Sequence, residues 1–294
     1  MRVGPAPVGN RGLGARAASA PARRGGETVA DDFILETQGL TKYFGGFAAL
    51  SDVNLRVRRG HLHSVIGPNG AGKTTLFNCL SGVLKPSAGR IILRGRDTAV
   101  GRRAAQPHHL ARRGLGRAFQ ITSLFPTLTV LENVRLAVQA RARSGSMSWI
   151  MWRSADRMRE VTERAAAIVE EVGLAGKEHV PAFALSHGDQ RKLDLGIALG
   201  SEPEVLLLDE PTAGVSREDV PGIVEVIERI RRTAELTILL VEHKMDIVLN
   251  ISDRITVLQH GKFLAEGTPR EIVANREVQA AYLGAEHVQH AGSA

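Results

Sequence analysis

Residues 67–75 combine the side chains and the spacing of a loop that binds phosphate. Gly67, Gly72, Lys73 and Thr74 fit the pattern G-x-x-x-x-G-K-[ST], in which glycines let successive backbone N–H groups approach phosphate oxygens. Lys73 is expected to reach the β- and γ-phosphates of a nucleoside triphosphate, and the Thr74 hydroxyl to ligate Mg²⁺. The residues predicted to hold the nucleotide are Gly67, Pro68, Asn69, Gly70, Ala71, Gly72, Lys73, Thr74 and Thr75.

The segments on either side of this loop have the patterns that it needs. His61–Ile66 predicts a short buried strand entering the loop, and Lys73–Ser81 carries apolar residues at helical spacing. The helix would direct its positive N-terminus at a bound anion. Strand, loop and helix together predict that the chain binds a nucleoside triphosphate.

A second apolar strand ends in two acids, in the segment Val205-Leu-Leu-Leu-Asp209-Glu210. Beside a phosphate loop, Asp209 is expected to hold Mg²⁺ through water, and Glu210 to polarise the water that attacks the terminal phosphate. Without that loop, an Asp-Glu pair would indicate no more than a solvated strand end.

The segment Leu185-Ser-His-Gly-Asp-Gln190, followed by a helix predicted over Arg191–Leu199, resembles the signature sequence of ATP-binding cassette (ABC) proteins. Ser186 precedes Asp209 by 23 residues, as is usual in that family. Physically, the Ser186 hydroxyl, the Gly188 N–H and a helix N-terminus form a second anion site. The resemblance implies that the signature of one subunit closes on ATP held by another, in a head-to-tail dimer.

Three further residues correspond to family positions. Phe44 lies where the family places an aromatic ring against adenine, and Gln120 where a glutamine contacts Mg²⁺ and the attacking water. His243, 34 residues after Asp209, corresponds to the histidine that contacts the γ-phosphate. The resemblance covers about residues 33–284. It implies an α/β fold, the P-loop NTPase domain of ABC proteins, with a parallel-sheet core, an antiparallel β layer and a helical subdomain. By this resemblance the catalytic residues are Glu210, His243 and Gln120, and the metal-binding residues are Thr74, Gln120 and Asp209.

Departures from the family pattern put the rate of ATP hydrolysis in question. His187 replaces the first glycine of the signature, and Asp189 stands where glutamine is usual. A carboxylate near ATP disfavours phosphate binding unless it faces away. Because an acid in the first turn of a helix is locally favourable, we expect Asp189 to cap its own helix. Later, Ser216 lacks the charge that normally helps tie the two sites together.

Hydrophobic patterning divides the rest of the chain into strands and helices. Strand-like patterns cover residues 34–40, 48–57 and 89–93. From Val205 strands, one of them at residues 237–241, alternate with helices, which implies a mainly parallel sheet. Helical patterns over 130–143 and 154–172, the second with Met158 among the apolar residues at helical spacing, predict a helical subdomain at about 121–187. It is inserted in an ATPase domain that spans residues 31–294.

Composition and charge exclude several classes of protein. Of the net charge of +7 on 294 residues, the first 30 residues hold five arginines against one glutamate, a net +4, which leaves +3 for the other 264. The nearly balanced remainder argues against a nucleic-acid partner. The first 30 residues, rich in Gly, Ala and Pro, predict a disordered basic extension, with an organellar transit peptide as a minor alternative. A single cysteine, Cys79, allows no disulfide within the chain and fits a reducing cytosol.

Segments near the C-terminus indicate which type of ABC protein the chain resembles. Residues 267–273 and 278–284 resemble the end of importer ATPases for branched-chain amino acids and for urea or short amides, and residues 127–134 resemble the larger of the two ATPase subunits. We favour the branched-chain amino-acid type, with the urea branch as the alternative because of Ser186-His-Gly188.

No apolar run approaches the roughly 20 residues that cross a bilayer, so a membrane role must come through partners. The resemblance implies transmembrane permease subunits, a second ATPase subunit that is identical or different, and indirectly a solute-binding protein. The chain is then expected to lie peripherally at the cytoplasmic face of the inner membrane.

Two other classes of function fit the sequence less well than transport does. ABC ATPases that act on DNA separate loop and signature by long coiled coils, and those that act on ribosomes carry two cassettes, whereas here 113 residues separate Lys73 from Ser186 in one cassette. A binding module without catalysis is opposed by the presence of Lys73, Asp209, Glu210 and His243. An active transport ATPase is the favoured interpretation.

Overall fold

The computed structural model describes residues 32–98, 106–118, 124–142, 154–233 and 235–282, together with Met1 and Gly4. The predicted basic extension, apart from Met1 and Gly4, and the predicted catalytic residue Gln120 therefore lie outside the described residues. Backbone contacts separate the first 31 residues from a unit that begins at Asp32, and the description below concerns that unit.

A six-stranded sheet in the order β11-β10-β4-β9-β8-β7 forms the centre of the fold. The strands from β10 to β7 are parallel neighbours, and β11 pairs antiparallel with β10 at one edge. Every residue of β4, β8 and β9 is buried, as expected for strands covered on both faces. The bounds are β4 Leu62–Ile66, β7 Leu115–Ala118, β8 Val205–Asp209, β9 Thr237–Val241, β10 Arg254–Gln259 and β11 Lys262–Gly267.

A second, antiparallel sheet has the order β2-β1-β5-β6, with β3 also paired to β1. Its strands are β1 Phe33–Phe44, β2 Phe47–Val53, β3 Arg56–Arg58, β5 Ala88–Leu93 and β6 Arg96–Asp97. One apolar cluster joins this sheet to the helix α1 (Lys73–Leu80) and to the six-stranded sheet, through residues such as Leu50, Phe77 and Leu239. The predicted combination of a parallel core with an antiparallel layer is confirmed.

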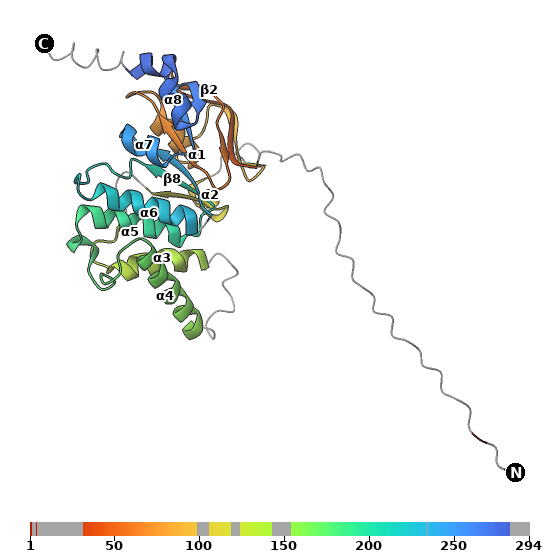
Figure 1. Ribbon diagram of the computed structural model, residues 1–294, viewed down its shortest axis with the longest axis vertical. Coiled ribbons are helices and arrows are strands. Elements are labelled where there is room, and N and C mark those ends of the chain that lie inside the picture. Colours follow the sequence, from red (N-terminus) through yellow and green to blue (C-terminus); the bar gives the residue numbers. More distant parts are fainter. Residues whose placement is uncertain are drawn as a thin grey trace. The chain divides into compact units, whose positions relative to one another are not determined.

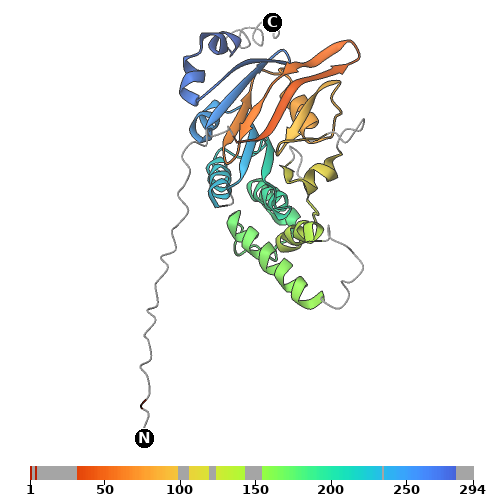
Figure 2. The same ribbon diagram turned by 90° about the vertical axis from the view of Figure 1, so that its right-hand side faces the viewer.

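Four longer helices pack together beside the six-stranded sheet. They are α3 Val130–Ala142, α4 Ser154–Glu171, α5 His187–Gly200 and α6 Val220–Thr233. Their buried residues share one apolar cluster with Leu206 of β8 and Ile238 of β9. Figure 2 shows α3 and α4 in green at the end away from the orange antiparallel strands, with α5 between them and the sheet.

Shorter helices occur elsewhere in the described unit, and Figure 1 labels α2, α7 and α8. The shorter helices are α2 Pro107–Arg112, the 3₁₀ turn η2 Ala182–Ala184, α7 Met245–Ile251 and α8 Pro269–Ala274. A further helical segment covers residues 276–282. The helices predicted over 130–143 and 154–172 are confirmed, although Met158 of α4 is exposed instead of joining the core. The predicted subdomain bounds of 121–187 stay a prediction.

Candidate nucleotide-binding and catalytic site

The phosphate loop connects the end of β4 to the start of α1, between β10 and β2. A Cβ atom on Gly67 would lie 2.2 Å from the carbonyl oxygen of Leu258 in β10. A Cβ atom on Gly72 would lie 2.7 Å from the carbonyl oxygen of Ala49 in β2. Both glycines also have positive φ angles, 154° and 99°, so only glycine fits at these positions.

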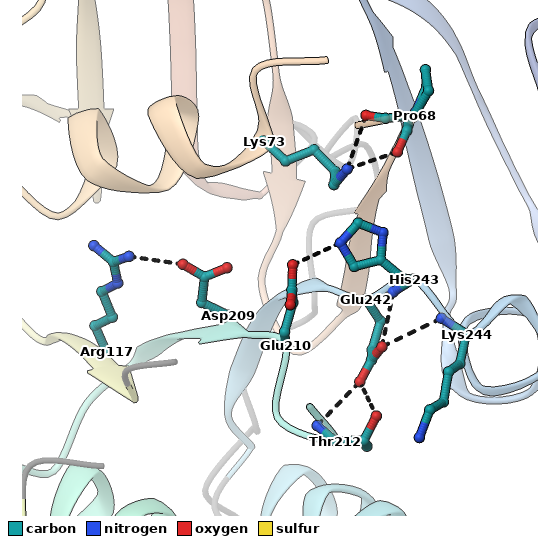
Figure 3. A network of polar contacts seen from close by, with 10 residues as sticks. Pro68, Lys73, Arg117, Asp209, Glu210, Thr212, Glu242, His243 and Lys244 are labelled. Carbon is teal, nitrogen blue, oxygen red and sulfur yellow. Dashed lines mark hydrogen bonds and ion pairs between the residues drawn. The ribbon is translucent and has the colours of Figure 1, made fainter. Parts of the chain in front are cut away.

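The start of α1 has the properties of an anion site. No side chain caps this helix at Gly72 in the described loop, so its first N–H groups are free to meet phosphate oxygens. Lys73 is buried, and its Nζ donates to the carbonyl oxygens of Gly67 at 2.7 Å and Pro68 at 3.2 Å (Figure 3). Burial lowers the pKa of Lys73, and the nearby charge of Glu210 opposes this shift. This loop therefore fits a triphosphate.

Asp209, at the end of β8, is held by an arginine that sequence reasoning missed. The Asp209 side chain is 3% exposed, and its Oδ2 accepts a hydrogen bond from Arg117 Nη2 at 2.8 Å (Figure 3). Arg117 Nη1 also donates to Asn78 Oδ1 at 2.8 Å and to Ser81 Oγ at 2.9 Å. Arg117 thus ties β7 and β8 to the helix that follows the phosphate loop. The only sign of this role in the sequence is that Arg117 is a charged residue within a short apolar strand.

Glu210 and His243 meet where two neighbouring parallel strands end. His243 Nε2 lies 2.7 Å from Glu210 Oε1, and the two side chains are 44% and 19% exposed respectively. Glu210 has a φ of 52°, which is uncommon outside glycine and common at functional sites. A partly exposed carboxylate hydrogen-bonded to an imidazole can orient a water molecule and accept its proton.

The oxygen atoms near the loop fit Mg²⁺. Thr74 at the start of α1 and Asp209 offer a hydroxyl and a carboxylate, which are the hard donors that Mg²⁺ prefers. Among the residues that the structure describes, no group of three or more His, Cys, Asp or Glu side chains could hold a metal ion. A Mg²⁺ ion here would therefore take its other ligands from water and the nucleotide, as is usual for this ion.

Phe44 lies at the end of the hairpin formed by β1 and β2. It pairs with Phe47, it is 48% exposed, and Lys42 Nζ lies 5.1 Å from the centroid of its ring. Because β2 packs on Gly72 through Ala49, the hairpin lies beside the phosphate loop. The ring of Phe44 is therefore available for stacking on a planar group.

The predicted signature residues lie at the N-terminus of α5. Figure 1 shows α5 apart from α1, the helix that follows the phosphate loop. Ser186 is the N-cap residue, and its Oγ accepts a hydrogen bond from the backbone N–H of Asp189 at 3.2 Å. Gly188 is buried against Asp219, whose Cγ would lie 3.0 Å from an added Cβ atom. A larger residue at position 188 would therefore press on Asp219, so packing as well as the predicted anion site favours a glycine here.

The prediction that Asp189 caps α5 is wrong, because Ser186 does so. The Asp189 carboxylate instead forms ion pairs with Lys177 at 2.5 Å and Lys192 at 3.7 Å. Burial raises the pKa of Asp189, but the hydrogen bond and the charge of Lys177 outweigh it and leave the pKa below its usual value. The helix also begins at His187, earlier than the predicted Arg191.

Comparison with known proteins places this geometry in a family. The profile of the family described as "ABC transporter" matches residues 50–213, which include the phosphate loop, Ser186 and the Asp209-Glu210 pair. The chain belongs to this ABC transporter family. It is an ATP-binding subunit, and its activity is ATP hydrolysis coupled to transport. None of the helices in the described part of the chain is long and apolar enough to cross a membrane.

Relatives of this ATP-binding subunit match most of its length. It is 41% identical over 253 residues to the high-affinity branched-chain amino acid transport ATP-binding protein LivG of Salmonella typhimurium, covering 85% of this chain and 98% of LivG. Its fold is similar to the ADP conformation of MJ1267, an ATP-binding cassette of an ABC transporter, with a TM-score of 0.72, 30% identity, and 86% and 99% of the two chains covered. It is also similar to the dimeric post-hydrolysis state of the cassette MJ0796 with ADP and Pi, with a TM-score of 0.66, 26% identity, and 80% and 99% covered.

A second profile, described as "Branched-chain amino acid ATP-binding cassette transporter", matches residues 264–288 of the subunit. The described part of this segment lies close to the phosphate loop. Val278 and Tyr282 belong to an apolar cluster that includes Ile66, the residue before Gly67. Burial raises the pKa of Tyr282 to about 12, while a hydrogen bond with the backbone of Gly67 acts in the opposite direction.

Proposed function

We propose that this subunit energises an importer for branched-chain amino acids. The observation that carries the proposal is the match of residues 264–288 to the profile named for branched-chain amino acid cassettes. The alignment with 98% of LivG supports it, because the likeness extends well beyond the motifs shared by all ABC ATPases.

In the proposed reaction, each described site residue has a role that follows from its place. Lys73 and the N–H groups at the start of α1 bind the triphosphate, Phe44 stacks on adenine, and Thr74 and Asp209 hold Mg²⁺. When bound, Mg²⁺ neutralises the charge that develops on the phosphate oxygens. Glu210 orients the attacking water and accepts its proton, and His243 directs the Glu210 carboxylate through their hydrogen bond. Gln120 is proposed as a further contact to metal and water.

The signature residues are proposed to act across a dimer interface. Ser186 and Gly188 would face the ATP of a second ATPase subunit, identical or different, because α5 lies apart from α1, the helix that follows the phosphate loop of its own chain (Figure 1). The Ser186 hydroxyl accepts one hydrogen bond within the helix cap and also interacts with the Asp189 carboxylate, so it would have to turn from Asp189 to donate to a phosphate. ATP-driven closure would then be transmitted to the membrane.

A groove between α2, α3, α5 and β7 is the proposed docking site for the permease. It measures about 610 Å³ and its floor is mainly apolar, with Leu110, Leu115 and Ile197 among the lining residues. Arg112 and Arg141 add positive charge to it. An apolar helix with acidic residues, presented by a cytoplasmic loop of the permease, would complement this groove. The subunit would then be peripheral at the cytoplasmic face of the inner membrane and would meet a solute-binding protein only indirectly.

Uptake measurements test the transported solute. Deleting the gene in the source organism should abolish saturable uptake of radiolabelled leucine, isoleucine and valine. The wild-type gene should restore uptake, and the Glu210→Gln variant, expressed at the same level, should not. Loss of urea uptake with leucine uptake intact would instead assign the subunit to the urea branch.

A further inference from the structure

Glu242 is a buried carboxylate at the end of β9, and four donors converge on it. It is 4% exposed. Its Oε1 accepts hydrogen bonds from the backbone N–H of Thr212, at 3.1 Å, and from the Thr212 hydroxyl. Its Oε2 accepts from the backbone N–H groups of His243, at 2.8 Å, and of Lys244, at 3.4 Å (Figure 3).

The position of Glu242 explains why these contacts matter. The pairing of β8 with β9 ends at Asp209 and Val241, and the last backbone hydrogen bond between them joins Glu210 N–H to Val241 O at 2.9 Å. Beyond this point the segment after β8 leads to Thr212, and the segment after β9 leads through Glu242 to His243. The Glu242 carboxylate bridges these two segments after the strand pairing has stopped.

These contacts close a ring around the catalytic pair. Glu210 meets His243 through their side chains, and the Glu242 carboxylate joins Thr212, two residues after Glu210, to the backbone N–H of His243. All four groups on Glu242 are donors, so its ionised form satisfies each of them, which a neutral side chain of the same size would not do.

We propose that Glu242 is a positioning residue for ATP hydrolysis, which fixes His243 relative to Glu210 without contacting the nucleotide. The proposal rests on the catalytic roles proposed above for Glu210 and His243. It predicts that loss of the Glu242 carboxylate slows the chemical step and leaves ATP binding intact, because Lys73 and the phosphate loop are not part of the ring.

The test is the Glu242→Gln variant of the full chain, assayed for Mg-ATP hydrolysis. The Gln side chain has one acceptor oxygen, and its NH₂ group would face N–H donors, so at least one donor loses its partner. We expect kcat to fall by about ten- to a hundredfold, which is less than the roughly 10²- to 10⁴-fold contribution of general-base catalysis itself, because Glu210 is still present but less well aligned. The KM for ATP should stay within about threefold of wild type, since the binding groups are untouched.

Glu266→Gln is the matched control. Glu266 is also a carboxylate held by two donors, the Arg254 guanidinium at 3.1 Å and the Thr256 hydroxyl at 3.3 Å, and it lies in strands away from the catalytic pair. This variant should keep the wild-type kcat. An equal fall of kcat in both variants would show a general loss of stability and would overturn the proposal.

A double variant separates positioning from a purely structural role. If Glu242 acts through His243, Glu242→Gln should slow the His243→Ala variant no further. A multiplicative fall in kcat would overturn the proposal.

Should Glu242→Gln not fold, Thr212→Val removes one donor and keeps the carboxylate, and it should lower kcat with KM unchanged. An unchanged kcat in Thr212→Val would contradict the proposed positioning role of Glu242. Wild-type rates for both Glu210→Gln and His243→Ala would instead refute the proposed catalytic roles themselves.

Discussion

His243 Nε2 and Glu210 Oε1 lie 2.7 Å apart, although the two residues are separated by 33 positions in the sequence. They meet because β8 and β9 are parallel neighbours whose carboxyl ends reach the same edge of the sheet. The contact places a carboxylate and an imidazole beside the phosphate loop.

Replacing Glu210 by Gln should stall hydrolysis and keep ATP binding. The amide is a poor base, so we expect kcat to fall by about 10² to 10⁴, while ATP still drives a shift from monomer to dimer in size-exclusion chromatography. Lys73→Ala is the comparison, because it removes the buried cation of the loop and should abolish both tight binding and the shift. A wild-type rate in Glu210→Gln would show that Glu210 is not the base.

Replacing Arg117 by Gln should destabilise the fold. The change leaves the Asp209 carboxylate, 3% exposed, without the guanidinium that now faces it, and breaking a buried ion pair typically lowers the free energy of unfolding by about 3–5 kcal/mol. Urea unfolding measures this. Adding Asp209→Asn should recover part of the stability without restoring ATPase activity. An unchanged urea midpoint in Arg117→Gln would contradict this account of the pair.

The Asp189→Gln variant should have a slightly lower stability and an unchanged ATPase rate. Its carboxylate is engaged by Lys177, which is 46% exposed, and a solvent-screened pair of this kind contributes about 1 kcal/mol or less. Lys177→Ala should lower the melting temperature by a similar amount. A faster ATPase with an unchanged melting temperature would show that Asp189 faces the ATP of the other subunit.

His63 should make the protein less stable in acid. It is 1% exposed, its Nε2 lies 2.7 Å from Thr256 Oγ1, and burial, followed by the charge of Arg254, lowers its pKa from 6.5 to about 3. Between these values the unfolded chain binds a proton that the native state does not, so stability is full above pH 6.5 and falls as the pH is lowered toward 3. The loss between pH 6.5 and pH 5 should be about 1.5 kcal/mol. Denaturation at several pH values should show this slope in wild type and a flatter one in His63→Gln. Parallel plots of unfolding free energy against pH for the two proteins would refute this role of His63.

Local patterns predicted much of the fold because they report burial directly. The strand β9 was predicted with its observed bounds, and the phosphate loop carries its function in consecutive residues. Arg117 and Glu242 could not be found in this way, since their partners lie 92 and 30 positions away and a single sequence does not show which side chains meet.

Ambiguous signals account for other differences. The spacing Ser186-x-x-Asp189 is typical of a helix start, but it overlaps the signature, and the start of α5 was therefore placed too late. Met158 has the helical spacing of a core residue and lies instead where Arg135 Nη1 donates to its sulfur at 3.4 Å. The bounds of the extension at residues 1–30 and the role of Gln120 stay predictions.

The close approach of Gly67 to Leu258 has a consequence for cooperativity. The loop cannot shift unless β10 shifts as well, and Ile66 and Tyr282 lie in one cluster with that strand. These segments should therefore open as a single unit in native-state hydrogen exchange. Because a ligand that binds only the closed form makes opening rarer, nucleotide should slow amide exchange in the helix at residues 276–282, some 200 positions along the chain from the loop it occupies.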